Sequence, residues 1–161
     1  MDTELKDISL RKIGPIKSIG VVINDLTETG KKDCTDIVSE IVIDTQLTDA
    51  LENLADFSHI IILYWMHHDH RPDEKKLLKS RPQRDTNNPR IGIFATRSPD
   101  RPNRIGISIA KLVHLKDNIL KVTGFDAIDS TPIVDIKPYI PGLDTVSNIK
   151  IASWAMKSEQ E

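Results

Sequence analysis

Alternating apolar and polar positions occur in several short segments of the first half of the chain and predict β-strands. Residues 13–23 (IGPIKSIGVVI) and 36–44 (DIVSEIVID) alternate in this way and are separated by a polar turn. Residues 60–66 (IIILYWM) are continuously apolar, which predicts a strand buried on both faces. This run is far too short to span a membrane as a helix. Three strands are therefore expected before residue 67.

The second half of the chain shows the same strand pattern, with turn residues between the segments. Residues 90–97 (RIGIFATR) predict a strand, and residues 104–128 predict a hairpin that turns at 116–118 (KDN). Residues 130–141 (STPIVDIKPYIP) carry prolines towards both ends, so they predict a compact turn or a single helical turn. Residues 149–156 (IKIASWAM) are compatible with a last strand or with a short packing segment.

One segment has helical rather than strand periodicity. Residues 45–57 (TQLTDALENLADF) place Leu47, Leu51 and Leu54 at helical spacing, with Thr45 or Thr48 as the capping residue. Six or seven strands with this helix predict a mainly β fold: a small antiparallel, barrel-like domain with one or two short helices. The seven glycines form no G-x-G-x-x-G motif, so a Rossmann fold is not expected.

Length and charge refine this prediction. The 161 residues predict one domain over 1–161, with a core from about 11 to 141 and a long basic loop over 69–90. Residues 71–104 contain ten Lys or Arg and four Asp or Glu, whereas the net charge of the whole chain is −2. Such a positive segment is a candidate contact surface for phosphates, although a solvated loop would explain the same charge.

The amino terminus and the cysteine content indicate a cytoplasmic protein. The charged segment 1–14 (MDTELKDISLRKIG) does not resemble a signal peptide, and no membrane partner is expected. Cys34 is the only cysteine, so it cannot form an internal disulfide, which fits a reducing compartment.

Residues 67–70 (HHDH) follow the central apolar segment and contain potential metal ligands. If the strand continued through them, His68 and His70 would share one face, and a further ligand would have to come from Asp100 or His114. Hydrogen bonding at the end of a strand and contact with a small ligand are the alternatives, and both are favoured over a metal.

Residues 92–106 (GIFATRSPDRPNRIG) place three arginines on a backbone stiffened by two prolines. A rigid arginine loses little entropy when it binds an anion. Arg97 directly follows an expected strand and suits a carboxylate or phosphate in bidentate geometry. An internal ion pair of Arg97 with Asp126 or Asp129 would explain the same residue.

Residues 123–139 contain three aspartates around a turn. Asp129 precedes Ser130 and could simply cap this turn. Asp126 lies within an apolar segment, where it could accept hydrogen bonds from ligand hydroxyls or take a proton from a bound group.

Three of these motifs together resemble one family. Residues 57–68 (FSHIIILYWMHH), 92–112 (GIFATRSPDRPNRIGISIAKL) and 129–141 (DSTPIVDIKPYIP) look like the TrmO (TsaA-like) family of S-adenosylmethionine-dependent tRNA (adenine-N6)-methyltransferases. The resemblance extends from about residue 13 to 141 and is to the short, single-domain archaeal-type members. It implies a barrel-like fold that is unrelated to Rossmann methyltransferases and that acts as a homodimer.

The resemblance also implies an activity. The methyl group of S-adenosylmethionine would be transferred to N6 of the threonylcarbamoyl-adenosine 3′ of the anticodon in tRNA. A regulatory or RNA-binding module that binds S-adenosylmethionine without turnover is the first alternative. A metal-dependent hydrolase built on residues 67–70 is the second.

The matching motifs assign roles to individual residues. The cofactor contacts that carry over from the family are His67, His68, Arg97, Gly106, Ile107, Thr123, Gly124, Phe125 and Asp126. The expected tRNA contacts are Arg101, Arg104, Arg84 and Arg90. Asp126 and Asp129 are the candidates for removing the proton of the acceptor nitrogen.

The chain departs from the family pattern at two positions within these motifs. Arg104 stands where the family has a proline, which adds a positive charge. Ser130 stands where the family has a glycine, which the turn tolerates unless this position requires a positive φ.

Overall fold

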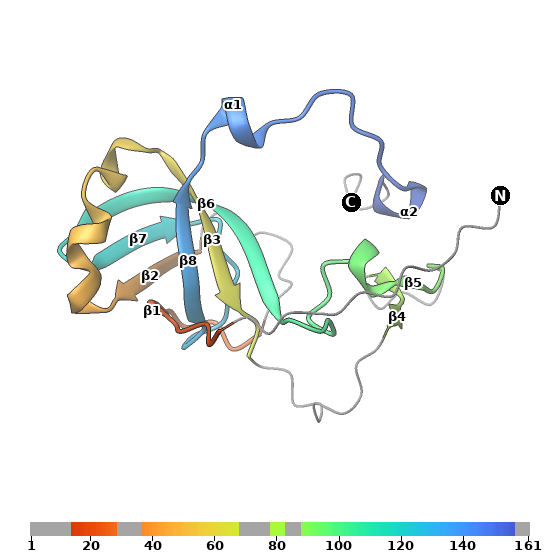
Figure 1. Ribbon diagram of the computed structural model, residues 1–161, viewed down its shortest axis with the longest axis horizontal. Helices are drawn as coiled ribbons and strands as arrows, with labels where there is room; N and C mark the ends of the chain where they lie inside the picture. Colours follow the sequence, from red (N-terminus) through yellow and green to blue (C-terminus); the bar gives the residue numbers. More distant parts are fainter. Residues whose placement is uncertain (1–13, 29–36, 68–77, 83–87, 157–161) are drawn as a thin grey trace.

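A closed antiparallel β-barrel forms the body of the protein. The computed structural model describes residues 14–28, 37–67, 78–82 and 88–156. Within these residues, six strands close in the order β1-β2-β7-β6-β3-β8 (Figure 1). They are β1 (Gly20–Ile23), β2 (Val38–Ile43), β3 (His59–Trp65), β6 (Ile105–Lys116), β7 (Ile119–Thr123) and β8 (Pro132–Pro138). The expected mainly β, barrel-like fold is therefore confirmed.

The remaining elements are short. β4 (Lys79–Ser80) and β5 (Ile91–Gly92) form a separate two-stranded sheet. The helical segments are the 3-10 helices η1 (Thr45–Leu51), η2 (Leu54–Asp56) and η4 (Ile93–Ala95), and the α-helices α1 (Pro141–Asp144) and α2 (Ser153–Met156). No helix in the described parts of the chain has the length and apolarity needed to cross a membrane.

Alternate side chains of the barrel strands fill its interior, as the period of a strand requires. Buried apolar side chains come from all six barrel strands and from the segment after β7; they are Val22, Ile41, Ile60, Ile62, Ala110, Leu120, Val122, Phe125 and Ile133. Each large side chain removed from water contributes about 1.5–3 kcal/mol to folding. These positions form the core that holds the functional residues at one end of the barrel.

The hairpin expected over residues 104–128 is present as β6 and β7. A two-residue turn joins them, and Asp117 adopts a left-handed conformation with φ 52°. The turn is also tied to β2, because the Ile43 N–H donates to the Asn118 carbonyl over 2.9 Å. Local turn chemistry predicted this element correctly because both strands and their connection are contiguous in sequence.

The expectation of a turn over residues 130–141 was wrong for most of that segment, which forms β8. This strand pairs with both β1 and β3 and thereby closes the barrel. Pro132 and Pro138 occupy its two ends, where a missing N–H interrupts little of the ladder. The expected first strand over residues 13–23 was also too long, since β1 begins only at Gly20.

Two other strand expectations also require correction. β3 is not buried on both faces: Ile60 and Ile62 are buried, whereas Ile61 and Leu63 are only partly covered. The expected strand over residues 90–97 ends at Gly92 and continues as the 3-10 turn η4. Arg97 therefore lies on a loop and does not terminate a buried strand.

The expected α-helix over residues 45–57 is instead two 3-10 helices, η1 and η2. Its cap is Asp44 and not a threonine, because the Asp44 side chain accepts from the Gln46 N–H over 3.0 Å. Only Leu51 of the apolar positions in η1 is buried. With so little apolar surface to cover, the segment crosses the barrel end without forming a regular α-helix.

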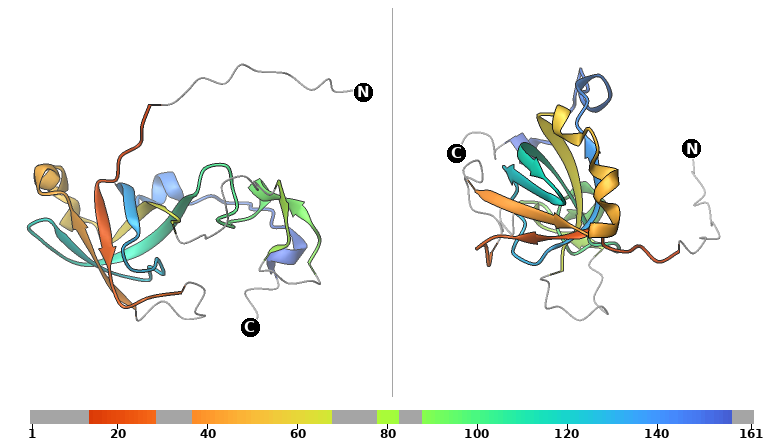
Figure 2. Two further views of the ribbon diagram at one scale, coloured as in Figure 1. Left: turned by 90° about the horizontal axis from the view of Figure 1, so that it is seen from below. Right: turned by 90° about the vertical axis from the view of Figure 1, so that its left-hand side faces the viewer.

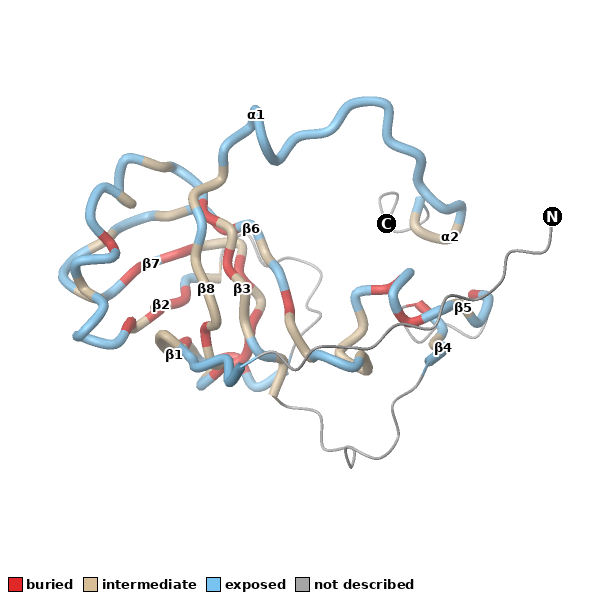
Figure 3. Tube along the Cα trace, in the orientation of Figure 1, coloured by how far each residue is buried: buried red, intermediate tan, exposed pale blue. Residues whose placement is uncertain are grey.

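A second unit, which we call the arm, projects from the barrel between β3 and β6. It comprises the described residues 78–82 and 88–104, with β4, β5 and η4. Figures 1 and 2 show β4, β5 and η4 away from the barrel, near α2. Burial is concentrated in the barrel strands, with a smaller buried cluster inside the arm (Figure 3). The arm carries the arginine-rich segment that the sequence singled out.

Candidate functional site

Residues from three distant parts of the sequence meet at one end of the barrel, which we call the mouth. The mouth consists of Tyr64, His67, Gly106, Phe125, Asp126 and Thr131. It forms because antiparallel pairing places the end of β3 beside the start of β6 and of β8. Tyr64 of β3 thus lies opposite Gly106 of β6 and Ile133 of β8.

Tyr64 occupies the centre of the mouth, although sequence reasoning treated it only as part of a buried strand. Its ring packs edge-on against Phe125, with centroids 5.3 Å apart and an interplanar angle of 77°. The Ser108 hydroxyl lies 3.5 Å from the Tyr64 hydroxyl and is oriented to donate to it. No motif indicated this residue, because an inward tyrosine within an apolar run is usually only a core residue.

Gly106 is required by the position of the Tyr64 ring. A Cβ atom at Gly106 would lie 2.4 Å from Cζ of Tyr64 and 2.5 Å from a ring carbon beside it. Phe125 packs against the same ring, so the ring cannot move away freely. The close backbone approach at Gly106, which the sequence assigned to cofactor binding, is thus also a packing requirement.

We expect Gly106→Ala to lower the free energy of unfolding by about 1–3 kcal/mol, because it overpacks the mouth against Tyr64. Gly142→Ala is the matched control, since a Cβ at Gly142 meets nothing within 4 Å. Urea denaturation of both variants measures the difference. Equal stability of the Gly106 variant and wild type would show that the Tyr64 ring is free to move.

Two oppositely charged side chains act on the Tyr64 hydroxyl. Burial raises the pKa of Tyr64, and the Ser108 hydrogen bond lowers it. The negative charge of Asp126 raises this pKa further, while the positive charge of Arg97 lowers it. The fold therefore brings two of the expected cofactor residues, one from the arm and one after β7, to the same group.

Both charged groups remain available for a ligand. Arg97 is exposed and Asp126 is half-buried. Neither side chain forms a hydrogen bond or an ion pair within the described parts of the chain, so the internal ion pair considered for Arg97 is not formed. The unpartnered Arg97 guanidinium can bind an anionic group of a ligand, and the unpartnered Asp126 carboxylate can accept a proton from a bound group.

Asp129 differs from Asp126, because its carboxylate is already engaged. Oδ1 accepts from the Asn24 N–H over 3.1 Å, and Oδ2 accepts from the Ser130 hydroxyl over 2.9 Å. The pKa of Asp129 is lowered, first by the Asn24 hydrogen bond and then by that of Ser130, with a smaller contribution from the charge of His67. The loop-capping alternative weighed for Asp129 thus matches its contacts in the structure.

The loop around Asp129 is anchored to β2 through Asn24. The Asn24 side-chain amide donates to the Ser39 hydroxyl over 2.8 Å and to the Ala127 carbonyl over 2.9 Å. Ser130 adopts φ 61°, so the position that is glycine in the family pattern does require the left-handed region. The serine accepts this conformation while donating to Asp129.

His67 lies beside the same loop. Its Nδ1 is 3.5 Å from the hydroxyl of Thr131, which is buried. His68, the second histidine expected to contact the cofactor, lies outside the described residues. Within the described parts of the chain, no three His, Cys, Asp or Glu residues gather in a metal-binding arrangement, and most of the HHDH segment lies outside those parts.

The turn after β7 directs Phe125 inwards against Tyr64 and leaves the next residue, Asp126, half-buried. Gly124 has φ 75°, which permits this change of direction directly after Thr123. Ile107, by contrast, is 50% exposed and alternates with the inward-facing Gly106. A cofactor contact at Ile107 would therefore have to involve its backbone.

The expected RNA-contacting arginines are in different environments. Arg101 braces its own loop, because Nε donates to the Ser98 carbonyl over 2.9 Å and Nη2 donates to the Thr96 carbonyl. Arg90 is exposed on the arm, and Arg104 is half-buried where the chain returns to the barrel. Arg84 lies outside the described residues.

Comparison with known proteins shows what this arrangement is similar to. A family model described as the tRNA-methyltransferase O N-terminal domain matches residues 29–145. An S-adenosyl-L-methionine-binding protein of Archaeoglobus fulgidus is 38% identical over 88% of this chain and 96% of its own length. A tRNA (adenine(37)-N6)-methyltransferase of Mus musculus is 40% identical over 63% of this chain and 23% of its own length.

The fold is also similar to solved structures. A crystal structure of TrmO from Pseudomonas aeruginosa matches with a TM-score of 0.70 and 26% identity, over 86% of this chain and 61% of that chain. A probable S-adenosyl-L-methionine-binding protein of Pyrococcus abyssi is 40% identical over 76% of this chain. The chain spans less than two thirds of the TrmO structure and of the P. abyssi protein, 61% and 63% respectively.

Proposed function

Because this chain belongs to the tRNA-methyltransferase O family, we propose that it transfers a methyl group from S-adenosylmethionine to tRNA. The proposed acceptor is N6 of the threonylcarbamoyl-adenosine 3′ of the anticodon, and the proposed compartment is the cytoplasm. We take residues 1–161 to act as one domain with the barrel as its core. The observation that carries the proposal is the mouth, where Tyr64 packs against Phe125 and Gly106, with the exposed Arg97 and the half-buried Asp126 unpartnered within the described parts of the chain.

The residues at the mouth fit S-adenosylmethionine, which supplies an electrophilic methyl group and carries a carboxylate on its amino-acid tail. The Arg97 guanidinium suits that carboxylate, since arginine binds carboxylates in bidentate geometry. Gly106 and Gly124 allow close approach of the ligand to the backbone. His67 and Thr123 border the same region and are proposed as further contacts.

Asp126 is proposed to accept the proton that leaves N6. When the nitrogen gains a bond to the methyl carbon, its N–H bond must break, and the proton needs an acceptor. The Asp126 carboxylate is unpartnered in the described parts of the chain, whereas both oxygens of Asp129 are hydrogen-bonded. Positioning of the two reactants at the mouth supplies the remainder of the rate enhancement.

The alternative function is binding of S-adenosylmethionine without turnover. The relative from Archaeoglobus fulgidus that matches over 96% of its length is named as a binding protein. The barrel and mouth described above would serve such a module equally well, because a pocket does not by itself prove catalysis.

Methyl transfer to RNA distinguishes the two functions. The purified chain is incubated with radiolabelled S-adenosylmethionine and tRNA, either carrying threonylcarbamoyl-adenosine or lacking the threonylcarbamoyl group. Label in the modified tRNA alone supports the proposed reaction, and label in both tRNAs shows that the group is not required. Saturable cofactor binding without label in any tRNA supports the binding module instead.

We further propose that the chain forms a homodimer through the outer face of β3 and β6. Three consecutive cross-strand pairs on this face are apolar, namely Ile61 with Ile109, Leu63 with Ile107, and Trp65 with Ile105, and the polar pair of His59 with Lys111 ends the apolar stretch. Ile107 and Ile109 are 50% and 53% exposed, which leaves a contiguous apolar surface in water. We propose that the same face of a second copy of the chain covers this surface, because the interface of a two-fold symmetric dimer uses the same patch on both subunits.

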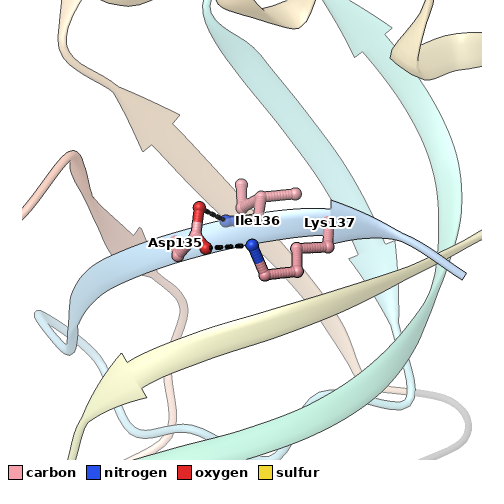
Figure 4. A network of polar contacts seen from close by, with 3 residues as sticks. All are labelled: Asp135, Ile136 and Lys137. Atoms are coloured by element: carbon pink, nitrogen blue, oxygen red, sulfur yellow. Dashed lines mark hydrogen bonds and ion pairs between the residues drawn. The ribbon is translucent and has the colours of Figure 1, made fainter.

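The neighbouring strand marks the border of this apolar face. On β8, Asp135 and Lys137 lie opposite Leu63 and Ile61, and their side chains form an ion pair of 2.7 Å (Figure 4). The Asp135 carboxylate also accepts from the Ile136 N–H over 3.0 Å. An exposed ion pair contributes little stability. A polar rim around an apolar centre is the usual anatomy of an interface.

Ile109→Glu is expected to convert the dimer to a monomer, because it places an unpaired charge in the centre of the apolar face. Size-exclusion chromatography with light scattering measures the mass. Val113→Glu is the matched control, since Val113 is 54% exposed on the same strand but lies beyond the residues paired with β3. A monomeric wild-type protein would contradict the proposal.

A further inference from the structure

Phe94 is the most exposed large apolar side chain among the described residues. It lies in η4 on the arm and is 81% exposed. Leu78, which directly precedes β4 in the arm, is 73% exposed. Phe125 is fully buried in the core, whereas Phe94 is exposed on the arm. The chemistry proposed for the mouth does not explain this exposure.

The turn that carries Phe94 is firmly held. Ile93 is 2% exposed, and its N–H donates to the Leu78 carbonyl over 3.0 Å. The Thr96 hydroxyl and the Thr96 N–H both donate to the Ile93 carbonyl, over 2.8 and 3.1 Å. Because its neighbours are anchored, Phe94 is presented outwards by a fixed backbone.

Cationic side chains outnumber acids in the arm that carries this aromatic ring. The described residues of the arm contain six cationic side chains and one acid; they are Lys79, Arg81, Arg90, Arg97, Arg101 and Arg104, with Asp100. Lys79 pairs with Gly92 in the small sheet, two residues from Phe94, and Arg90 directly precedes β5. Both Lys79 and Arg90 are exposed.

An exposed aromatic ring on a unit that is rich in lysine and arginine matches the chemistry of single-stranded nucleic acid recognition. Bases stack on aromatic side chains, and lysines and arginines bind the adjoining phosphates. A protein partner would explain the apolar side chains but not the excess of positive charge. Charge complementarity therefore favours a polyanion with unpaired bases.

We propose that Phe94 stacks on an unpaired base of the RNA substrate while Lys79 and Arg90 bind its phosphates. This inference rests on the proposed function, because it takes RNA as the substrate. It assigns recognition of an unpaired loop to the arm, whereas cofactor binding and proton transfer belong to the mouth. The arm thereby selects looped RNA over duplex RNA.

Binding of two RNAs to the full chain tests the proposal. One probe is a fluorescently labelled anticodon stem-loop, and the other is a blunt duplex of the same number of phosphates. Phe94→Ala is expected to weaken stem-loop binding about 5- to 150-fold, the equivalent of one stacked base, and to leave duplex binding unchanged. Phe94→Trp is expected to bind the stem-loop like wild type.

Variants of Lys79 and Arg90 are expected to differ from Phe94→Ala in their effect on duplex binding. Replacing Lys79 and Arg90 by alanine is expected to weaken both probes and to reduce the dependence of log K on log salt by up to about 2. S-adenosylmethionine affinity, measured by calorimetry, is expected to stay at the wild-type value in all these variants. Unchanged cofactor affinity also shows that each variant is folded.

Three outcomes overturn the proposal, and they have different meanings. Equal binding of wild type and Phe94→Ala to the stem-loop would overturn the inference alone. A loss of dimer mass in Phe94→Ala without a change in RNA affinity would assign this side chain to the second copy. Absence of RNA binding by the wild-type protein would overturn the proposed RNA substrate as well.

Discussion

Asp126→Asn is expected to lower the rate of methyl transfer about 100- to 10,000-fold, the usual contribution of a general base. The amide keeps the size of the side chain but cannot take the N6 proton. Affinity for S-adenosylmethionine is expected to change little, because the proton acceptor acts on the acceptor nucleotide. Single-turnover transfer to tRNA measures the rate, and calorimetry measures the affinity.

Asp129→Ala provides the control, since Asp129 was the second candidate base on the sequence alone. Its hydrogen bonds to Asn24 and Ser130 cap a loop, so we expect a lower stability and a smaller change in rate than in Asp126→Asn. If Asp129→Ala lost more methyl-transfer rate than Asp126→Asn, Asp129 and not Asp126 would be assigned as the proton acceptor. Equal loss of rate and cofactor affinity in Asp126→Asn would move Asp126 to a binding role.

Arg97→Ala is expected to weaken S-adenosylmethionine binding about 10- to 150-fold, because hydrogen bonds to charged groups contribute about 1.5–3 kcal/mol. The structure supports this role through the unpartnered, exposed guanidinium that acts on Tyr64 at the mouth. Calorimetric titration of the cofactor into wild type and variant measures the difference.

Two further arginine variants separate geometry from charge. Arg97→Lys keeps the charge but loses the planar fork, so we expect an intermediate affinity. Arg90→Ala removes an equally exposed charge from the arm and is expected to leave cofactor affinity unchanged. A similar loss in both alanine variants would show that only the overall charge of the arm matters. Wild-type affinity in Arg97→Ala would remove Arg97 from the cofactor site.

Local patterns predicted the elements whose partners are close in sequence. The hairpin of β6 and β7 was predicted with its turn, because both strands and the two turn residues are contiguous. The strand expected over residues 36–44 is present as β2, although its inward positions include the polar Ser39. β8 was missed, because its prolines are typical of turns and its pairing with β1 and β3 involves residues about 70 or more positions away.

The candidate site was predicted as a set of residue types, without the contacts that distinguish them. Asp126 and Asp129 are three residues apart, and both remained candidate bases on the sequence alone, although capping of a turn was already the simpler explanation for Asp129. Only the contact between Asn24 and Asp129, across 105 residues, shows that one carboxylate is engaged. Tyr64 was not indicated at all, since its role depends on Phe125 and Gly106, which are distant in sequence.

The amino-acid sequence by itself determined the mainly β fold, the positive segment and the family motifs, because these depend on composition, periodicity and residues close together in the chain. The tertiary structure alone decided which acid is unpartnered within the described residues, that Arg97 is exposed on a loop, and that Phe94 is presented to solvent. These properties depend on burial and long-range hydrogen bonds, and both exist only once the barrel has closed and brought distant strands together.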